Sequence, residues 1–110
     1  ISFGSGAGDD GGTVSAAGGA GADTFIFGTS AQNLTIDLGE GDQDRDSVTF
    51  EGSVYSATIA NWEVGLDVVS VLYKADWSGG DNGADTTFTN GTEEITFLEV
   101  TGVAFDEFFL

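Results

Sequence analysis

The segment 18–26 constrains the fold of this chain more than any other part. Its sequence, Gly-Gly-Ala-Gly-Ala-Asp-Thr-Phe-Ile, follows the pattern Gly-Gly-x-Gly-x-Asp-x-U-x, in which U is a large apolar residue. Glycines permit positive φ, so that backbone carbonyls can turn toward a shared point. Stacked turns of this kind place carbonyl and carboxylate oxygens around Ca²⁺, which prefers about six to eight oxygen ligands. The segment therefore predicts a calcium-binding turn that leads into a strand, with Gly18, Gly19, Gly21 and Asp23 as ligands.

This nonapeptide resembles the repeats of the repeats-in-toxin (haemolysin-type) family of calcium-binding β-rolls, over roughly residues 4–50. The resemblance implies a parallel β-roll, calcium-induced folding and type I secretion. It also extends the expected ligands to an incomplete earlier copy, Gly6, Gly8 and Asp10. Asp10 and Asp23 lie 13 positions apart, where the family spaces them by about nine, so we expect one or two sites rather than an array. The alternative is a flexible Gly-Ala linker with incidental aspartates.

The acidic loop that follows is a second candidate. Asp42, Asp44 and Asp46 occupy alternate positions, so their carboxylates could converge on one cation if the loop curls. We do not expect an EF-hand, because Ser47 stands where that motif needs glycine and Ser53 where it needs glutamate. The loop is either a further group of Ca²⁺ ligands or a plain solvated acidic turn.

The loop 79–88 is a third candidate, because it repeats the Gly-Ala-Asp-Thr of residues 21–24. Extra residues stand before its third glycine and before its aromatic residue, so it matches the nonapeptide imperfectly. A hairpin or connecting loop is the favoured interpretation. If this loop binds calcium, Asp81 and Asp85 are its ligands.

Short runs rich in β-branched and aromatic residues predict an all-β fold of about seven to eight strands. The expected strands are 24–27, 33–38, 46–50, 54–59, 64–73, 86–89, 94–100 and 103–110. Asn90-Gly91 predicts a hairpin turn, and only 56–64 has any helical character. We expect one domain, 1–110, in which a β-roll-like amino-terminal segment, 1–50, packs on a β-sandwich or roll, 51–110.

Charge narrows the range of functions. The chain has 19 acidic and 2 basic residues, a formal net charge of −17, which leaves no basic face for nucleic acid or anionic membranes. Disorder is excluded as well, because 40% of the residues are hydrophobic and 12% aromatic. The absence of Cys and His removes disulfides, thiol and imidazole catalysis and the common zinc ligands, but leaves hard cations open. No carboxylate pair stands out as catalytic, so we expect no enzyme.

The two ends of the chain bear on its processing and export. No apolar run reaches the roughly 18–20 residues of a transmembrane helix. The sequence starts at Ile1 without a signal-like segment, which we interpret as a trimmed or excised product. At the other end, an acidic pair followed by Phe108-Phe109-Leu110 is similar to the carboxyl-terminal element of type I secretion substrates of the family.

We therefore expect a secreted, non-catalytic calcium-binding β protein, extracellular or on a bacterial cell surface. One alternative is a structural subunit of an extracellular filament, surface layer or adhesive matrix, a homo-oligomer joined by strand pairing with the help of calcium. A second is a carbohydrate-binding module in which Trp77, beside loop 78–84, stacks on an extracellular glycan. The competing interpretation of Trp77, and of Trp62, Tyr55 and Tyr73, is that these aromatic residues belong to the core.

Overall fold

The chain is all-β. A computed structural model describes residues 2–3, 14–19, 21–27, 34–39, 44–51, 56–71, 74–91, 93–103 and 105–109. The strands are β1 (Ser2–Phe3), β2 (Val14–Ala17), β3 (Thr24–Phe27), β4 (Leu34–Asp37), β5 (Ser47–Phe50), β6 (Ser56–Ala60), β7 (Val68–Ser70), β8 (Ser78–Asp81), β9 (Thr86–Thr89) and β10 (Glu94–Phe97). Two short 3-10 helices, η1 (Lys74–Asp76) and η2 (Phe105–Glu107), complete the described elements.

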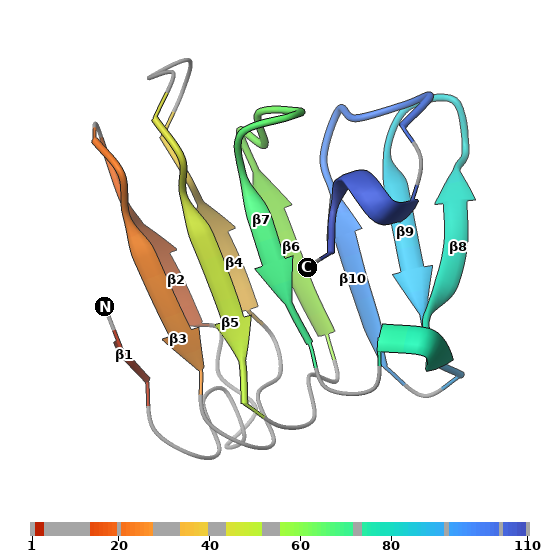
Figure 1. Cartoon of the computed structure of the whole chain (residues 1–110), viewed down its shortest axis with the longest axis horizontal. Coiled ribbons are helices and arrows are strands. Elements are labelled where there is room, and N and C mark those ends of the chain that lie inside the picture. Colours follow the sequence, from red (N-terminus) through yellow and green to blue (C-terminus); the bar gives the residue numbers. More distant parts are fainter. Residues whose placement is uncertain are drawn as a thin grey trace.

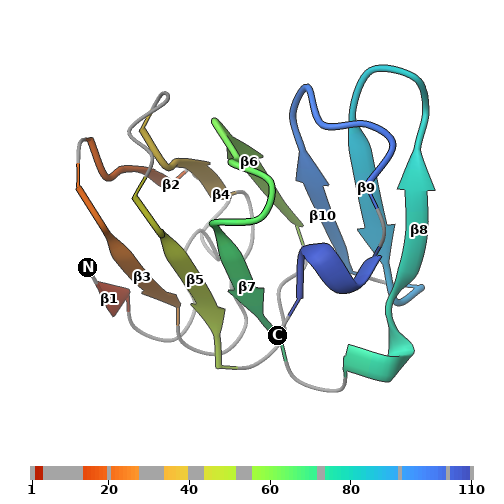
Figure 2. The same ribbon diagram turned by 45° about the horizontal axis from the view of Figure 1, so that its top comes forward.

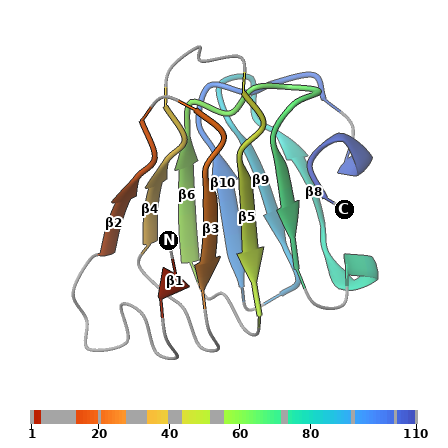
Figure 3. The same ribbon diagram turned by 60° about the vertical axis from the view of Figure 1, so that its left-hand side comes forward.

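The strands form two sheets, which lie one behind the other in Figure 1 and are seen from the β1–β2 side in Figure 3. Sheet A has the order β1-β3-β5-β7, and sheet B the order β2-β4-β6-β10-β9-β8. Sheet A is parallel throughout, as is sheet B from β2 to β10, whereas β9 runs antiparallel to β10 and to β8. From β1 to β7 successive strands alternate between the sheets.

This alternation divides the first part of the chain into repeating units that we call coils. Coil 1 consists of β2 and β3, coil 2 of β4 and β5, and coil 3 of β6 and β7. The coils are stacked in register: Thr24 pairs with Ser47 and Ser47 with Val68 in sheet A, while Leu34 pairs with Ala57 in sheet B. Each strand thus takes its hydrogen-bonding partner from the neighbouring coil.

The core lies between the sheets because apolar residues occupy alternate positions of the strands. In β4, for example, Leu34 and Ile36 are buried while Thr35 is exposed. The largest fully buried side chains are Phe25, Phe27, Phe50, Phe88, Phe97, Phe108, Ile36, Leu38, Ile59, Ile95 and Val48. Strand β10 also has only one buried face, because Ile95 and Phe97 are buried while Glu94 is exposed and Thr96 half-buried.

A group of packed aromatic side chains fills the carboxyl-terminal end of the core; we call it the aromatic cluster. Its members are Trp62, Trp77, Phe88, Phe97, Phe105, Phe108 and Phe109. Phe108 is fully buried, with its ring 4.5 Å from that of Phe97 and 5.6 Å from that of Trp62 between centroids. The same segment covers the edge of sheet A, since the Val69 N–H donates to the Phe108 carbonyl at 2.9 Å.

Several expected elements are wrong in detail. The strand expected over 64–73 shortens to β7, because 64–66 form a turn in which Gly65 has φ +84° and Val64 is 52% exposed. The strand expected over 94–100 ends at Phe97, where the chain turns and Glu99 adopts φ +60°. The segment 56–64, which has some helical character in sequence, begins with strand β6.

At the carboxyl end, 103–110 is not a strand: it contains η2, whose Phe108 N–H donates to the Phe105 carbonyl at 3.1 Å. The glycine-rich segment Ser78–Asp81, expected as loop, is strand β8. The hairpin at Asn90-Gly91 is confirmed, but Thr89 pairs with Glu94, so the connection has four residues rather than two. The amino-terminal segment does not pack as a unit on the remainder, because strands from both parts share each sheet.

Candidate functional site

Three aspartates form a column at the end of the molecule where sheet B passes the chain to sheet A, the upper end of Figure 2. Asp23, Asp46 and Asp67 close the connections 18–23, 38–46 and 61–67, and each directly precedes a strand of sheet A. Because these strands are paired in register, the three residues lie in neighbouring coils, about 4.7–4.9 Å from one coil to the next. We call this set the aspartate column.

Hydrogen bonds run along the aspartate column from coil to coil. The Asp23 N–H donates to Asp46 Oδ1 at 2.8 Å, and the Asp46 N–H donates to Asp67 Oδ1 at 2.9 Å. Asp67 Oδ2 accepts a third bond, from the Glu63 N–H at 2.7 Å. Asp46 is fully buried and Asp67 is 1% exposed. Since a buried carboxylate is costly unless hydrogen bonds compensate it, these bonds hold the column in place.

The coil 1 end of the column lies beside the glycine turn. Asp23 Oδ2, like Asp46 Oδ2, is buried and accepts no hydrogen bond within the part of the chain that the structure describes. It lies against Gly18, where an added Cβ would overlap this oxygen. Gly19 and Gly21 have φ of +74° and +93°, a conformation that favours glycine. The glycines of segment 18–26 therefore have two separate structural roles. Gly19 and Gly21 allow the chain to turn, and Gly18 leaves room for the Asp23 carboxylate.

This end of the column has one feature that suits a hard cation and lacks another. A buried carboxylate oxygen without a hydrogen bond is an oxygen that Ca²⁺ would satisfy. Among the described residues, however, no three acidic side chains are grouped closely enough to hold a metal ion. Among the described residues, Asp23 and Asp46 are therefore the side chains of the column whose buried oxygens could hold such an ion.

The other expected ligands are placed as follows. Gly6, Gly8, Asp10 and Asp42 lie outside the described residues. Asp44 is exposed and Asp46 fully buried, so these two expected partners differ sharply in their surroundings. The structure joins Asp46 to Asp23 and Asp67 instead, through the hydrogen bonds of the column.

Asp81 and Asp85 belong to the β8–β9 hairpin, the interpretation favoured from sequence. Asp81 Oδ2 accepts the Gly102 N–H at 2.9 Å, and Asp85 Oδ1 accepts the Glu99 N–H at 2.7 Å. Both carboxylates therefore tie this hairpin to the turn that follows β10. Their strands are antiparallel, so the loop does not continue the stack of coils.

The tryptophans belong to the core. Trp77 is 5% and Trp62 7% exposed, and both are members of the aromatic cluster. Neither offers an open face on which a sugar ring could stack, so the carbohydrate-binding hypothesis loses the residue on which it depended. Tyr55 and Tyr73 lie outside the described residues.

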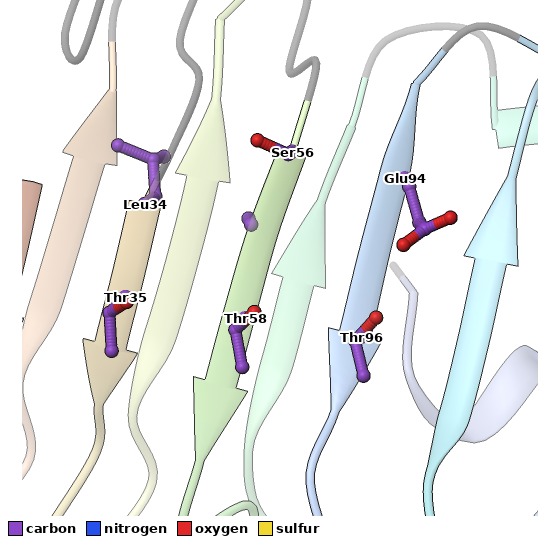
Figure 4. A pocket seen from close by; sticks show the side chains of 7 residues that line it. Leu34, Thr35, Ser56, Thr58, Glu94 and Thr96 are labelled. Atoms are coloured by element: carbon purple, nitrogen blue, oxygen red, sulfur yellow. The ribbon is translucent and has the colours of Figure 1, made fainter. Parts of the chain in front are cut away.

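An open groove of about 240 Å³ runs over the outer face of sheet B. Figure 4 shows Thr35, Thr58 and Thr96 side by side on three neighbouring strands, with Ser56 and Glu94 near one end. Strand pairing sets the threonines in register from β4 to β6 to β10. The groove is smaller than the roughly 300–1,000 Å³ of typical ligand pockets and has no aromatic side chain in its lining.

Asp37, at the end of β4, makes a second link between coils. Its Oδ1 accepts the Asn61 Nδ2–H at 2.7 Å and the Gly39 N–H at 2.9 Å. The Asn61 hydrogen bond, with a smaller contribution from Gly39, lowers the pKa of Asp37 below its ordinary 3.8. Asn61 holds this position with φ +61°, which asparagine tolerates better than most residues.

Asp67 is a member of the column that is not among the ligands expected from the sequence. The signal was present, because Asp23, Asp46 and Asp67 each begin the pattern Asp-x-U-x-U, in which U is Phe or Val. Their spacings are 23 and 21 residues, so a search for copies spaced by about nine residues does not detect them.

Comparisons with known proteins gave no match: no family model, curated protein or solved structure matches the chain. None of the helices in the described segments has the length and apolar character needed to cross a membrane.

Proposed function

We propose that this chain is a non-catalytic, calcium-stabilised β-roll of the repeats-in-toxin type that works outside the cell. The observation that carries the proposal is the Gly18–Asp23 contact, where a buried carboxylate oxygen that accepts no hydrogen bond from the described residues faces a glycine that leaves it room. The alternation of parallel strands between two sheets supports the β-roll. The carboxyl-terminal acidic-aromatic segment supports export by a type I system.

In this proposal Asp23 and Asp46 hold the ion together with carbonyls of the turn 18–21. A bound Ca²⁺ supplies positive charge that offsets the repulsion among carboxylates in a chain of net charge −17. Asp23 contributes its buried Oδ2, Gly18 keeps the space beside it open, and the positive φ of Gly19 and Gly21 turns the backbone. Because the ion binds the folded coil, millimolar extracellular calcium stabilises that coil by mass action.

Isothermal titration with CaCl₂, and thermal unfolding in EDTA and in calcium, test the proposal. We expect heat of binding and a higher melting temperature in calcium, with no comparable effect of NaCl at equal ionic strength. Asp23→Asn should abolish both effects, while Asp76→Asn, which removes the same charge from an exposed site in η1, should keep them. Equal calcium responses of the two variants would contradict the proposed site.

A further inference from the structure

The three members of the aspartate column differ in how far the protein itself satisfies them. Asp67 has both carboxylate oxygens engaged by backbone N–H groups, those of Asp46 and Glu63. At the other end, Asp23 Oδ2 is buried without a hydrogen bond from any described residue. Asp46 Oδ2 is likewise buried without a hydrogen bond from a described residue, so within the column only Asp67 has both oxygens engaged by backbone donors.

The connection in coil 3 is closed by its own hydrogen bonds. The N–H groups of Leu66 and Asp67 both donate to the Glu63 carbonyl, at 3.1 and 3.0 Å. The Asp67 carboxylate in turn accepts a hydrogen bond from the Glu63 N–H, so the turn 63–67 is fixed from both sides. In coil 1 the corresponding connection is the glycine turn, which glycine makes costly to order.

The aromatic cluster stabilises the same part of the chain. Trp62 lies in the coil 3 connection and packs edge-on against Phe97 of β10 at 4.8 Å between ring centroids. Phe108 stacks on Trp62 and supplies the carbonyl that pairs with Val69 of β7. Coil 3 is thus held by buried rings and backbone hydrogen bonds that involve no ion.

We infer that calcium dependence is confined to the amino-terminal coils, and that Asp67 replaces a bound ion in coil 3. The part of the chain from β6 to the carboxyl end then folds without calcium and offers its open β6–β7 edge as a template. Coils 2 and 1 add to this edge as Asp46 and Asp23 take their places in the column. This inference rests on the proposed function and assigns the order in which calcium acts.

Hydrogen exchange with and without calcium, resolved by segment, tests the partition in the whole chain. In EDTA, exchange in 14–27 should rise by roughly tenfold relative to calcium at ten times its Kd, while 56–71 and 86–97 should change little. Tryptophan fluorescence offers a second readout, because both tryptophans of the chain lie in the aromatic cluster. Their emission should stay native-like in EDTA while far-UV circular dichroism loses strand signal.

Matched variants separate the two roles in the column. Asp67→Asn should lower the melting temperature equally in EDTA and in calcium, whereas Asp23→Asn should lower it in calcium alone. If Asp67→Asn fails to fold, the segment-by-segment hydrogen exchange of the wild type still shows whether calcium dependence is confined to the amino-terminal coils. If calcium binds but changes hydrogen exchange equally along the whole chain, calcium dependence is not confined to the amino-terminal coils, and only this inference is wrong. If calcium has no effect at all, the proposed function is wrong and the inference with it.

Discussion

Gly18→Ala is the substitution that tests the geometry of the candidate site most directly. Gly18, unlike Gly19 and Gly21, does not have positive φ, so alanine is compatible with its backbone. The new methyl group would overlap Asp23 Oδ2 and stand 2.8 Å from Asp23 Cγ. The carboxylate must therefore swing away, and the variant perturbs the proposed ligand without changing a charge.

The size of the effect follows from the affinity expected of such a site. Extracellular calcium modules have Kd values of about 10⁻⁴–10⁻³ M. At about 10 mM Ca²⁺, a site in that range stabilises the folded state by about 1.4–2.7 kcal/mol. For a domain of this size that raises the melting temperature by roughly 6–11 °C, at about 4 °C per kcal/mol. Gly18→Ala should lose most of this calcium-induced rise in melting temperature. In EDTA its free energy of unfolding should fall only by the roughly 0.5–1.5 kcal/mol that a displaced side chain costs.

Thermal unfolding followed by circular dichroism, in EDTA and over a calcium series, measures both quantities. Gly80→Ala is the neutral control, because nothing lies within 4 Å of a Cβ at that exposed position. Gly65→Ala is the control for backbone strain outside the candidate site: its φ of +84°, with nothing within 4 Å of an added Cβ, should cost about 1–2 kcal/mol in both conditions and leave the calcium rise in place. If Gly18→Ala keeps the full wild-type rise, Asp23 Oδ2 is not a ligand.

Two further predictions concern stability. Phe108→Ala should lower the free energy of unfolding in urea by about 3–5 kcal/mol, because Phe108 is fully buried among aromatic rings. Leu98→Ala, at a residue 36% exposed, should stay within about 0.5 kcal/mol, and similar losses in both would argue against the cluster. Asn61→Gly should destabilise the chain at neutral pH, since it removes the main cause of the lowered Asp37 pKa while keeping positive φ accessible. A carboxyl group with a lowered pKa stabilises the fold at pH values above its ordinary pKa of 3.8, and this stabilisation is lost as the pH falls through the folded-state pKa. The melting temperatures of variant and wild type should therefore converge in acid. A difference that stays constant to low pH would contradict the role of the Asn61–Asp37 hydrogen bond.

The sequence predicted the class of the fold and the glycine conformation of one turn. Alternating apolar residues located β3, β4 and β5 closely, because each such strand has one buried face. The glycine pattern identified Asp23, since the turn chemistry is local. Pairing between strands that lie 20 or more residues apart is not local, so the parallel stacking of Asp23, Asp46 and Asp67 became visible only in the fold.

The errors have a common cause. Apolar residues are frequent in 64–73 and 103–110, and this predicted strands. Such residues can also be buried outside strands: Phe108 and Phe109, for example, pack in the core next to a 3-10 helix. The tryptophans show the same ambiguity, because an aromatic residue beside a glycine-rich loop has the same sequence signature whether it is exposed or buried. Trp77 is buried in the aromatic cluster, where its ring centroid lies 6.3 Å from that of Phe109.

The nearest-neighbour stacking of the coils also decides how the protein bears mechanical load. In the first part of the chain, each strand contacts chiefly the strand of the adjacent coil, so a force applied at the amino end meets the hydrogen bonds of one coil at a time. Such a chain unzips in steps, and each step releases about 20 residues of contour length, the distance in sequence between Val14 and its partner Leu34. Beyond β7 the antiparallel hairpins and the ring-filled end would resist as one unit, so the molecule would lengthen from its amino end while its carboxyl end stayed folded.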